Sequence, residues 1–360
     1  MKRLLKYLIE LLIMFGIYVV CDGPGIKKYL AVLLLMMVCF IAGRQKKRSL
    51  RITACVFLPA FVYVSLGLLN TLINASEYMN TFKIIIFWMI PLLFAFSLYV
   101  FYGEEMHHIV DVQFVGSCLA YLIPKGRFIL ETITVESMFA YTYGAFFTYY
   151  AYKKRWGFCV IAAVLMFLTD KRIVVLAVAI AVFVQLLLWL FRNDKRIAFG
   201  IWGMASVIMN VYLWIIYSGT LHAFLQGIGI NTNGRTKMYG KVTEWFGNKF
   251  FAMGHGLGIV EELLIAWRIQ DFSNLHNDLL KFHIELGFVG FLLLLVSYGV
   301  VFYLVERYYG TSKLKLFLSM VIYTMMLFAT DNVSIYVIYL IPVYSIYFAV
   351  LAEKQQKEII

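Results

Sequence analysis

The chain alternates between long apolar runs and short polar breaks. A membrane-spanning helix needs about 20 mostly apolar residues, and twelve segments approach this length and character. These segments are residues 4–20, 26–43, 52–73, 82–101, 107–123, 137–152, 156–170, 172–191, 197–218, 284–304, 314–330 and 333–351. The pattern predicts an all-α integral membrane protein with about twelve transmembrane helices. Segment 107–123 is the most polar, with His107, His108 and Asp111, and it either spans the membrane or re-enters it.

The composition agrees with this prediction. The 360 residues are 62% hydrophobic and 14% charged, whereas soluble domains are about 25% charged. A soluble globular protein is therefore excluded. The five cysteines are scattered and form no C-x-x-C pair, which argues against a disulfide framework or a zinc site.

Lysine and arginine residues concentrate in alternate connections between the predicted spans. The dense clusters are Lys2, Arg3 and Lys6; residues 44–51; residues 153–155; residues 192–196; Arg307, Lys313 and Lys315; and Lys354 with Lys357. Because cytoplasmic loops carry an excess of basic residues, this pattern predicts that both termini are cytoplasmic. Topology and attraction to anionic membrane lipid account for the net charge of +12, so no nucleic-acid partner is needed.

One connection, residues 219–283, is much longer than the others and falls on the outer side. Long connections are usually functional or disordered, and Trp245, Phe246 and Phe250 argue against disorder. We expect short interfacial helices here. The predicted organisation is residues 1–218 with nine transmembrane helices, the extracytoplasmic loop 219–283, and residues 284–360 with three helices and a short cytoplasmic tail.

Two arginines on the predicted outer side follow breaks in the pattern. Arg235 comes directly after the Asn-Gly turn at 233–234 and starts a helical segment. Backbone N–H groups at a helix start favour phosphate, and arginine binds it in a bidentate manner. Arg172 starts a span after the tight break Thr169–Lys171. The alternatives are an interfacial anchor for Arg235 and a solvated hairpin tip for Arg172.

The remaining candidates are weaker or lie near the tenth span. Arg127 is in the outer connection 123–137, which also fits a plain amphipathic connector. His276 stands at the end of the long loop, where a neutral imidazole can take a proton from a hydroxyl. Lys281 and Glu285 have i, i+4 spacing, which predicts an ion pair that neutralises both near the lipid.

These motifs, in this order, resemble the superfamily of bacterial O-antigen polymerases (Wzy) and O-antigen ligases. HNDLLKFHIELGFVG, starting at His276, resembles the family's H-N-x-x-L followed by a glutamate and glycines. NGRTKMYGKVTEWFGNKFFAMGHGLG is similar to the family's S-G-R segment, with Asn233 in place of serine, Tyr239 at the aromatic position and no proline after Asn248. TDKRIVVLAV resembles the family's S-R at the start of a span, with Asp170 and Lys171 departing from it. GRFILETITVES is similar to an earlier arginine segment but lacks its proline-asparagine.

The resemblance implies a membrane glycosyltransferase of the C-type (GT-C) fold, inverting and metal-independent, with no cofactor. Its donor would be a glycan on undecaprenyl diphosphate, at the bacterial cytoplasmic membrane. Arg172, Arg235 and Arg127 would bind the diphosphate, and His276 would be the catalytic base. Asn277, Glu285 and Tyr239 would support them.

The implied activity is polymerisation of oligosaccharide repeat units into O-antigen, capsule or exopolysaccharide. A chain-length regulator and a flippase of the same pathway would be partners. Two alternatives stay open: ligase-type transfer of finished polymer to an acceptor, and a polysaccharide flippase or transporter. A transporter would carry ionisable residues near mid-membrane, whereas the spans after residue 123 carry theirs mainly at the ends.

Overall fold

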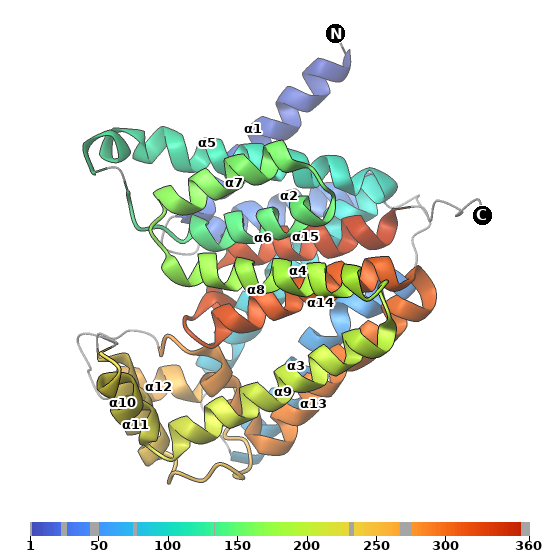
Figure 1. Cartoon of the computed structure of the whole chain (residues 1–360). Coiled ribbons are helices and arrows are strands. Elements are labelled where there is room, and N and C mark those ends of the chain that lie inside the picture. Colours follow the sequence, from blue (N-terminus) through green and yellow to red (C-terminus); the bar gives the residue numbers. More distant parts are fainter. Residues whose placement is uncertain are drawn as a thin grey trace.

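The computed structural model describes residues 2–22, 27–43, 50–74, 78–132, 134–229, 234–266 and 275–353, and these residues form helices and connections with no strand (Figure 1). The longer helices are α1 (Lys2–Asp22), α2 (Lys27–Gly43), α3 (Leu50–Asn74), α4 (Tyr78–Tyr102), α5 (Met106–Thr132), α6 (Phe139–Tyr152), α7 (Trp156–Leu168), α8 (Arg172–Leu190), α9 (Lys195–Tyr217), α13 (Asp278–Tyr309), α14 (Thr311–Phe328) and α15 (Val337–Ala352). The shorter ones are α10 (Thr220–Gly227), α11 (Arg235–Trp245), α12 (Ile259–Ala266) and the 3-10 turns η1 (Gly103–Glu105) and η2 (Val333–Ile335).

Each of the twelve predicted spans coincides with one of the longer helices. Among the described residues, seven helical stretches are long and apolar enough to cross a membrane, and one of them, Asn80–Gly126, contains both α4 and α5. Tyr29–Gly43, Trp156–Leu168 and Val337–Ala352 are shorter apolar helices. The chain is thus an all-α polytopic membrane protein, as predicted. The number of crossings and their orientation stay predictions.

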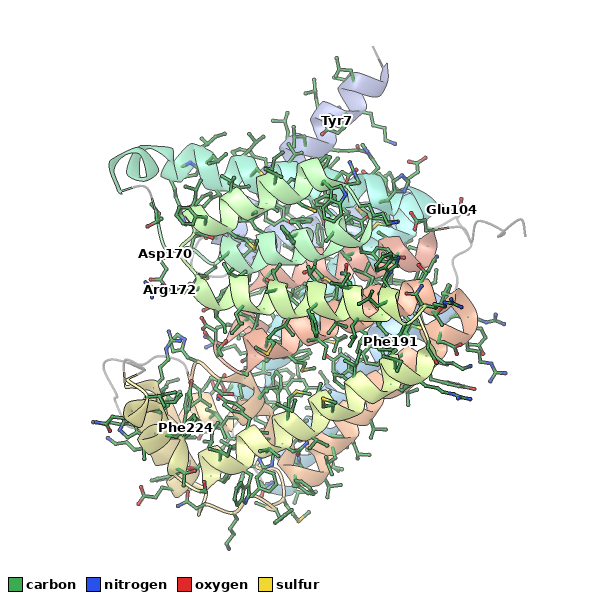
Figure 2. All side chains as sticks on the ribbon, viewed as in Figure 1. Tyr7, Glu104, Asp170, Arg172, Phe191 and Phe224 are labelled. Carbon is green, nitrogen blue, oxygen red and sulfur yellow. The ribbon has the colours of Figure 1, made fainter. Side chains whose placement is uncertain are left out.

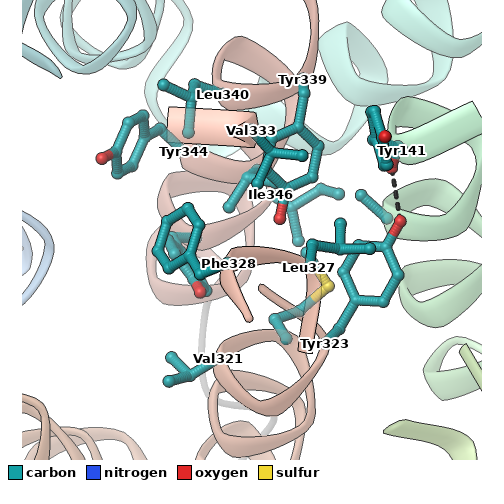
Figure 3. Close-up of a cluster of buried hydrophobic side chains, with 14 of the residues drawn as sticks. Tyr141, Val321, Tyr323, Leu327, Phe328, Val333, Tyr339, Leu340, Tyr344 and Ile346 are labelled. Carbon is teal, nitrogen blue, oxygen red and sulfur yellow. Dashed lines mark hydrogen bonds between the residues drawn. The ribbon is translucent and has the colours of Figure 1, made fainter. Parts of the chain in front are cut away.

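The core of the fold is built around the C-terminal helix. All residues of α15 except the last are buried, as expected for a helix that is apolar on every side. It packs against α4, α5 and α6. Figure 3 shows its side chains interleaved with those of α14, next to Tyr141 from α6. The Tyr323 hydroxyl of α14 donates to the Tyr141 carbonyl at 2.7 Å, which ties α14 to α6.

Helix α13 is bent near its start. Gly287 has φ 72° and ψ 173°, a conformation that a glycine adopts readily. The bend frees backbone carbonyls from the helical ladder, and the loop before α12 replaces the lost bonds: the N–H groups of His255 and Gly256 donate to the carbonyls of Ile284 and Glu285 at 3.0 and 3.1 Å. This segment is therefore enclosed in protein, and α13 begins at Asp278, earlier than the predicted start of the tenth span at residue 284.

The connections between the longer helices gather at two opposite sides of the molecule. Figure 2 shows Asp170, Arg172 and Phe224 on one side of the molecule, and Glu104 and Phe191 on the other. The short helices α10, α11 and α12 form within the loop 219–283, where short helices were predicted, and they gather on the Arg172 side (Figure 1).

Candidate active site at the His276–Asp331 pair

A histidine and an aspartate from different elements meet at the end of the long loop. His276 directly precedes Asn277, the N-cap of α13, whose side-chain oxygen accepts from the Leu280 N–H at 3.0 Å. The His276 Nδ1 atom lies 2.8 Å from Oδ1 of Asp331, in the turn after α14. The Asp331 side chain is only 5% exposed, whereas the His276 side chain is 26% exposed. The carboxylate is therefore buried behind the imidazole, and the imidazole is partly exposed at the protein surface.

The surroundings of Asp331 keep it ionised. Burial raises the pKa of its carboxyl, but hydrogen bonds from His276, Tyr141 and the Asn332 N–H outweigh burial and lower the pKa to about 2. An ionised carboxylate only accepts hydrogen bonds, so the proton between the two side chains resides on Nδ1. In the neutral imidazole the lone pair is then on Nε2, an atom that makes no hydrogen bond with the part of the chain that the structure describes.

The backbone of His276 is held in an uncommon conformation. Its φ is 53°, in the left-handed region that residues other than glycine rarely adopt. The Tyr239 hydroxyl of α11 donates to the His276 carbonyl at 2.9 Å, and the Asn277 amide donates to the Tyr212 hydroxyl of α9 at 2.9 Å. Such strain persists where neighbouring groups impose it. Tyr239 thus holds the backbone carbonyl of His276, and Tyr212 holds Asn277, the residue that follows His276 in the chain.

One predicted phosphate-binding arginine lies beside the pair. Arg235, the first residue of α11, donates to the Thr330 carbonyl at 3.3 Å. Thr330 directly precedes Asp331, so this contact brings the guanidinium next to the His276–Asp331 pair.

The other two predicted arginines are placed differently. Arg172 is exposed at the start of α8 and makes no hydrogen bond or ion pair with the described residues. Figure 2 shows it on the side of the molecule where α10 to α12 gather. Arg127 belongs to α5, but its side chain lies outside the described residues.

Lys171, which directly precedes Arg172, also lies near the His276–Asp331 pair. Its Nζ lies 5.9 Å from the centre of the Tyr141 ring, whose hydroxyl donates to Asp331. It also pairs with Glu136 from the connection before α6. A second cation thus accompanies Arg235 near Asp331, at one of the two positions where the chain departs from the family's S-R motif.

The predicted pair between Lys281 and Glu285 is wrong. Glu285 is fully buried and accepts from the Gly258 N–H at 2.8 Å and from the Tyr63 hydroxyl of α3. Lys281 instead pairs with Glu261 of α12. The reason is that this part of α13 is enclosed by protein, so each charged group has a partner on another element. Glu285 thereby fastens the glycine-containing loop 254–258 and α3 to α13, and does not contact His276 in the described structure.

The glycines at 254, 256 and 258 shape the loop before α12, and Gly256 and Gly258 have positive φ. A Cβ atom at Gly254 would lie 2.4 Å from the Glu285 carbonyl oxygen, so only glycine allows this close approach. Within the described residues, no group of three or more His, Cys, Asp or Glu side chains could hold a metal ion. All five cysteines are free.

Asp331 is the functional candidate that the sequence motifs missed. It stands between the last two predicted spans in the short segment TDNVS, on the predicted outer side. A lone carboxylate in an outer turn was the available signal. Its distance from the other motifs along the chain hid the relationship with His276.

Comparison with known families agrees with these features. Residues 157–295 match the family described as O-antigen ligase (Wzy_C), a segment that contains Arg172, Arg235 and His276 and ends before Asp331. The chain has no match among curated proteins and none among solved structures. The family covers O-antigen polymerase and ligase activity of membrane glycosyltransferase-like enzymes. Residues 157–295 of this multi-pass membrane protein are thus an O-antigen ligase (Wzy_C) domain, which confirms the resemblance to the O-antigen polymerase and ligase superfamily.

Proposed function

We propose that the protein is a polysaccharide polymerase that joins oligosaccharide repeat units carried on undecaprenyl diphosphate. The reaction would take place at the outer face of the bacterial cytoplasmic membrane. The observation that carries the proposal is His276: its Nδ1 is bonded to an ionised Asp331, its Nε2 is open, and Arg235 lies beside the pair. This arrangement occurs where an O-antigen ligase domain meets the end of its long loop.

In the proposed reaction, a sugar hydroxyl of the acceptor repeat unit attacks the anomeric carbon of the donor sugar. The hydroxyl oxygen forms the new glycosidic bond, and its proton passes to His276 Nε2. The anomeric C–O bond to the diphosphate breaks, and undecaprenyl diphosphate leaves with the electron pair. Attack opposite the leaving group inverts the anomeric centre. Asp331 stabilises the imidazolium that forms and fixes the ring orientation, a role that buried carboxylates have beside catalytic histidines.

The cations would act on the leaving group. Negative charge on the diphosphate grows as the C–O bond breaks, so a cation placed there stabilises the transition state more than the ground state. The bond of Arg235 to Thr330 and the place of Lys171 above Tyr141 support this role. We assign Arg172 and Arg127 to the same diphosphate as more peripheral groups. These side chains would supply the charge stabilisation for which other enzymes use a metal ion.

A ligase is the second candidate, because the matching family is described as O-antigen ligase. A ligase would use the same base and the same cations with a finished polymer as donor. We favour the polymerase because it is required wherever capsule or exopolysaccharide is assembled from lipid-linked repeat units. A chain-length regulator and a flippase are the partners that such an assembly requires.

The deciding experiment is to identify the lipid-linked glycans that accumulate when the gene is deleted. Single repeat units on the outer face of the membrane support the polymerase. Long polymer on the lipid would establish a ligase, and repeat units held on the cytoplasmic face would establish a flippase. A chromosomal His276→Ala variant that still reaches the membrane should give the same accumulation as the deletion, and wild-type polymer in that variant would contradict the assignment of the base.

A further inference from the structure

A pocket with several polar side chains is lined in part by Tyr239, whose hydroxyl donates to the His276 carbonyl. It has a volume of about 350 Å³ and is formed between the end of α9, α10 and α11. Its polar lining consists of His222, Thr236, Lys237, Lys241 and Glu244, with Tyr239 as a shared wall. His222 Nδ1 and the Thr236 hydroxyl are 2.8 Å apart, which ties α10 to α11. The pocket thus lies between three helices and shares Tyr239 with the support of His276.

Two lysines give this pocket a positive charge. Lys237 and Lys241 are spaced i, i+4, so both project from one face of α11. Both are exposed, and neither makes a hydrogen bond or ion pair with the residues that the structure describes. Two like charges at this spacing repel each other, and an anionic group between them would relieve the repulsion.

We infer that this pocket binds an acidic sugar of the acceptor glycan, with the sugar carboxylate between Lys237 and Lys241. The inference rests on the proposed function, because it gives the acceptor chain a place beside the proposed base. Tyr239 connects the two: its ring lines the pocket while its hydroxyl binds the His276 carbonyl. A glycan held in the pocket places its next sugar close to His276.

The lining favours a sugar over a lipid headgroup. Glu244 and the Thr236–His222 pair offer acceptors and donors for sugar hydroxyls. An acidic sugar places its carboxylate at the lysines and has several ring hydroxyls that can donate to Glu244, more than the glycerol headgroup of phosphatidylglycerol offers.

The test uses the oligosaccharide released by mild acid from the lipid-linked repeat units that accumulate in His276→Ala cells. The inference requires this oligosaccharide to contain a carboxylate. Its binding to the purified full chain in detergent is measured by calorimetry. A matched ligand is the same oligosaccharide with its carboxyl groups reduced to alcohols. We expect the reduced ligand to bind roughly tenfold more weakly, because it loses its charge-assisted hydrogen bonds.

The matching protein variant is Lys237→Gln with Lys241→Gln. We expect it to bind the acidic oligosaccharide roughly tenfold more weakly than the wild type, and to bind the reduced oligosaccharide like the wild type. Lys249→Gln, an exposed lysine of the same loop outside the pocket, is the control and should bind both ligands unchanged.

Each other outcome overturns the inference. A neutral repeat unit, equal binding of the two ligands, or undiminished binding by the double variant would do so while leaving the proposed function intact. The same holds if the double variant loses binding of short-chain phosphatidylglycerol in mixed micelles but keeps the oligosaccharide, since the pocket then binds lipid. If His276→Ala cells accumulate no lipid-linked oligosaccharide, the proposed function fails, and the inference fails with it.

Discussion

His276 Nδ1 and Asp331 Oδ1 lie 2.8 Å apart although 55 residues separate them in the chain. The two residues stand at the entrance of α13 and the exit of α14, which pack against each other. Asp331 is nearly enclosed, and His276 keeps a quarter of its side chain exposed. A buried carboxylate therefore orients an accessible imidazole, and the free nitrogen of the ring points away from its support.

We expect Asp331→Asn to reduce polymer formation by about a hundredfold or more, because the neutral amide neither stabilises the imidazolium nor selects the Nδ1–H tautomer. The measurement is the rate of chain extension in membranes supplied with lipid-linked repeat units. Asp170→Asn is the matched control, an exposed aspartate in the connection before α8. If Asp331→Asn extends chains at the wild-type rate, the pair has no catalytic role.

Replacing the arginines with lysine should separate charge from geometry. Arg235→Lys and Arg172→Lys keep the charge but lose the planar fork that binds phosphate through two parallel hydrogen bonds. We expect each to lower kcat by about tenfold or more, with a larger loss for Arg235 because it lies next to Asp331. Arg192→Lys, an exposed arginine on the opposite side, should have no effect. Wild-type kinetics in Arg172→Lys would mean that Arg172 contributes only its positive charge to the membrane topology and does not bind the diphosphate through its planar fork.

The helices could be predicted because hydropathy in this chain is strongly patterned. Each predicted span corresponds to a helix, since a chain that must satisfy its backbone in lipid has few other choices. The end of the long loop was harder to predict. Residues 278–285 mix charged and apolar side chains and looked like a membrane edge, yet the bend at Gly287 and the loop before α12 enclose them. A pattern of polarity along one segment does not show what other segments cover it.

The candidate site was predictable only in part for the same reason. His276, Arg235, Tyr239 and Asn277 fall in neighbouring motifs, and the structure brings them together around one turn. Asp331 comes from the end of the chain, where no local spacing connects it with His276. Lys281 and Glu285 show the reverse error: their spacing fits an ion pair, but partners from α12 and α3 are available inside the fold.

Glu285 should matter for stability more than for catalysis. Glu285→Ala leaves the Gly258 N–H and the Tyr63 hydroxyl without their acceptor in a buried place, and we expect a loss of about 3 kcal/mol in the free energy of unfolding. The measurement is thermal unfolding in detergent. Glu105→Ala removes an exposed carboxylate paired with Lys6 and should shift the transition little. Equal transitions for Glu285→Ala and the wild type would show that the loop is held by other contacts.

The ionisation of Asp331 should appear in the pH dependence of stability. Its pKa falls from the usual 3.8 to about 2 in the folded protein. Because the folded state binds this proton more weakly than the unfolded state does, the carboxylate stabilises the fold above pH 4 and loses that contribution as the pH falls towards 2. The shift corresponds to about 2 kcal/mol. We expect the wild type to unfold at a higher temperature than Asp331→Asn from pH 5 to 7, and the difference to shrink between pH 4 and 2. The exposed Asp170→Asn variant should track the wild type throughout. If the difference between Asp331→Asn and the wild type persists unchanged to pH 2, Asp331 stabilises the fold through packing and neutral hydrogen bonds. Its negative charge would then not be the feature that orients His276.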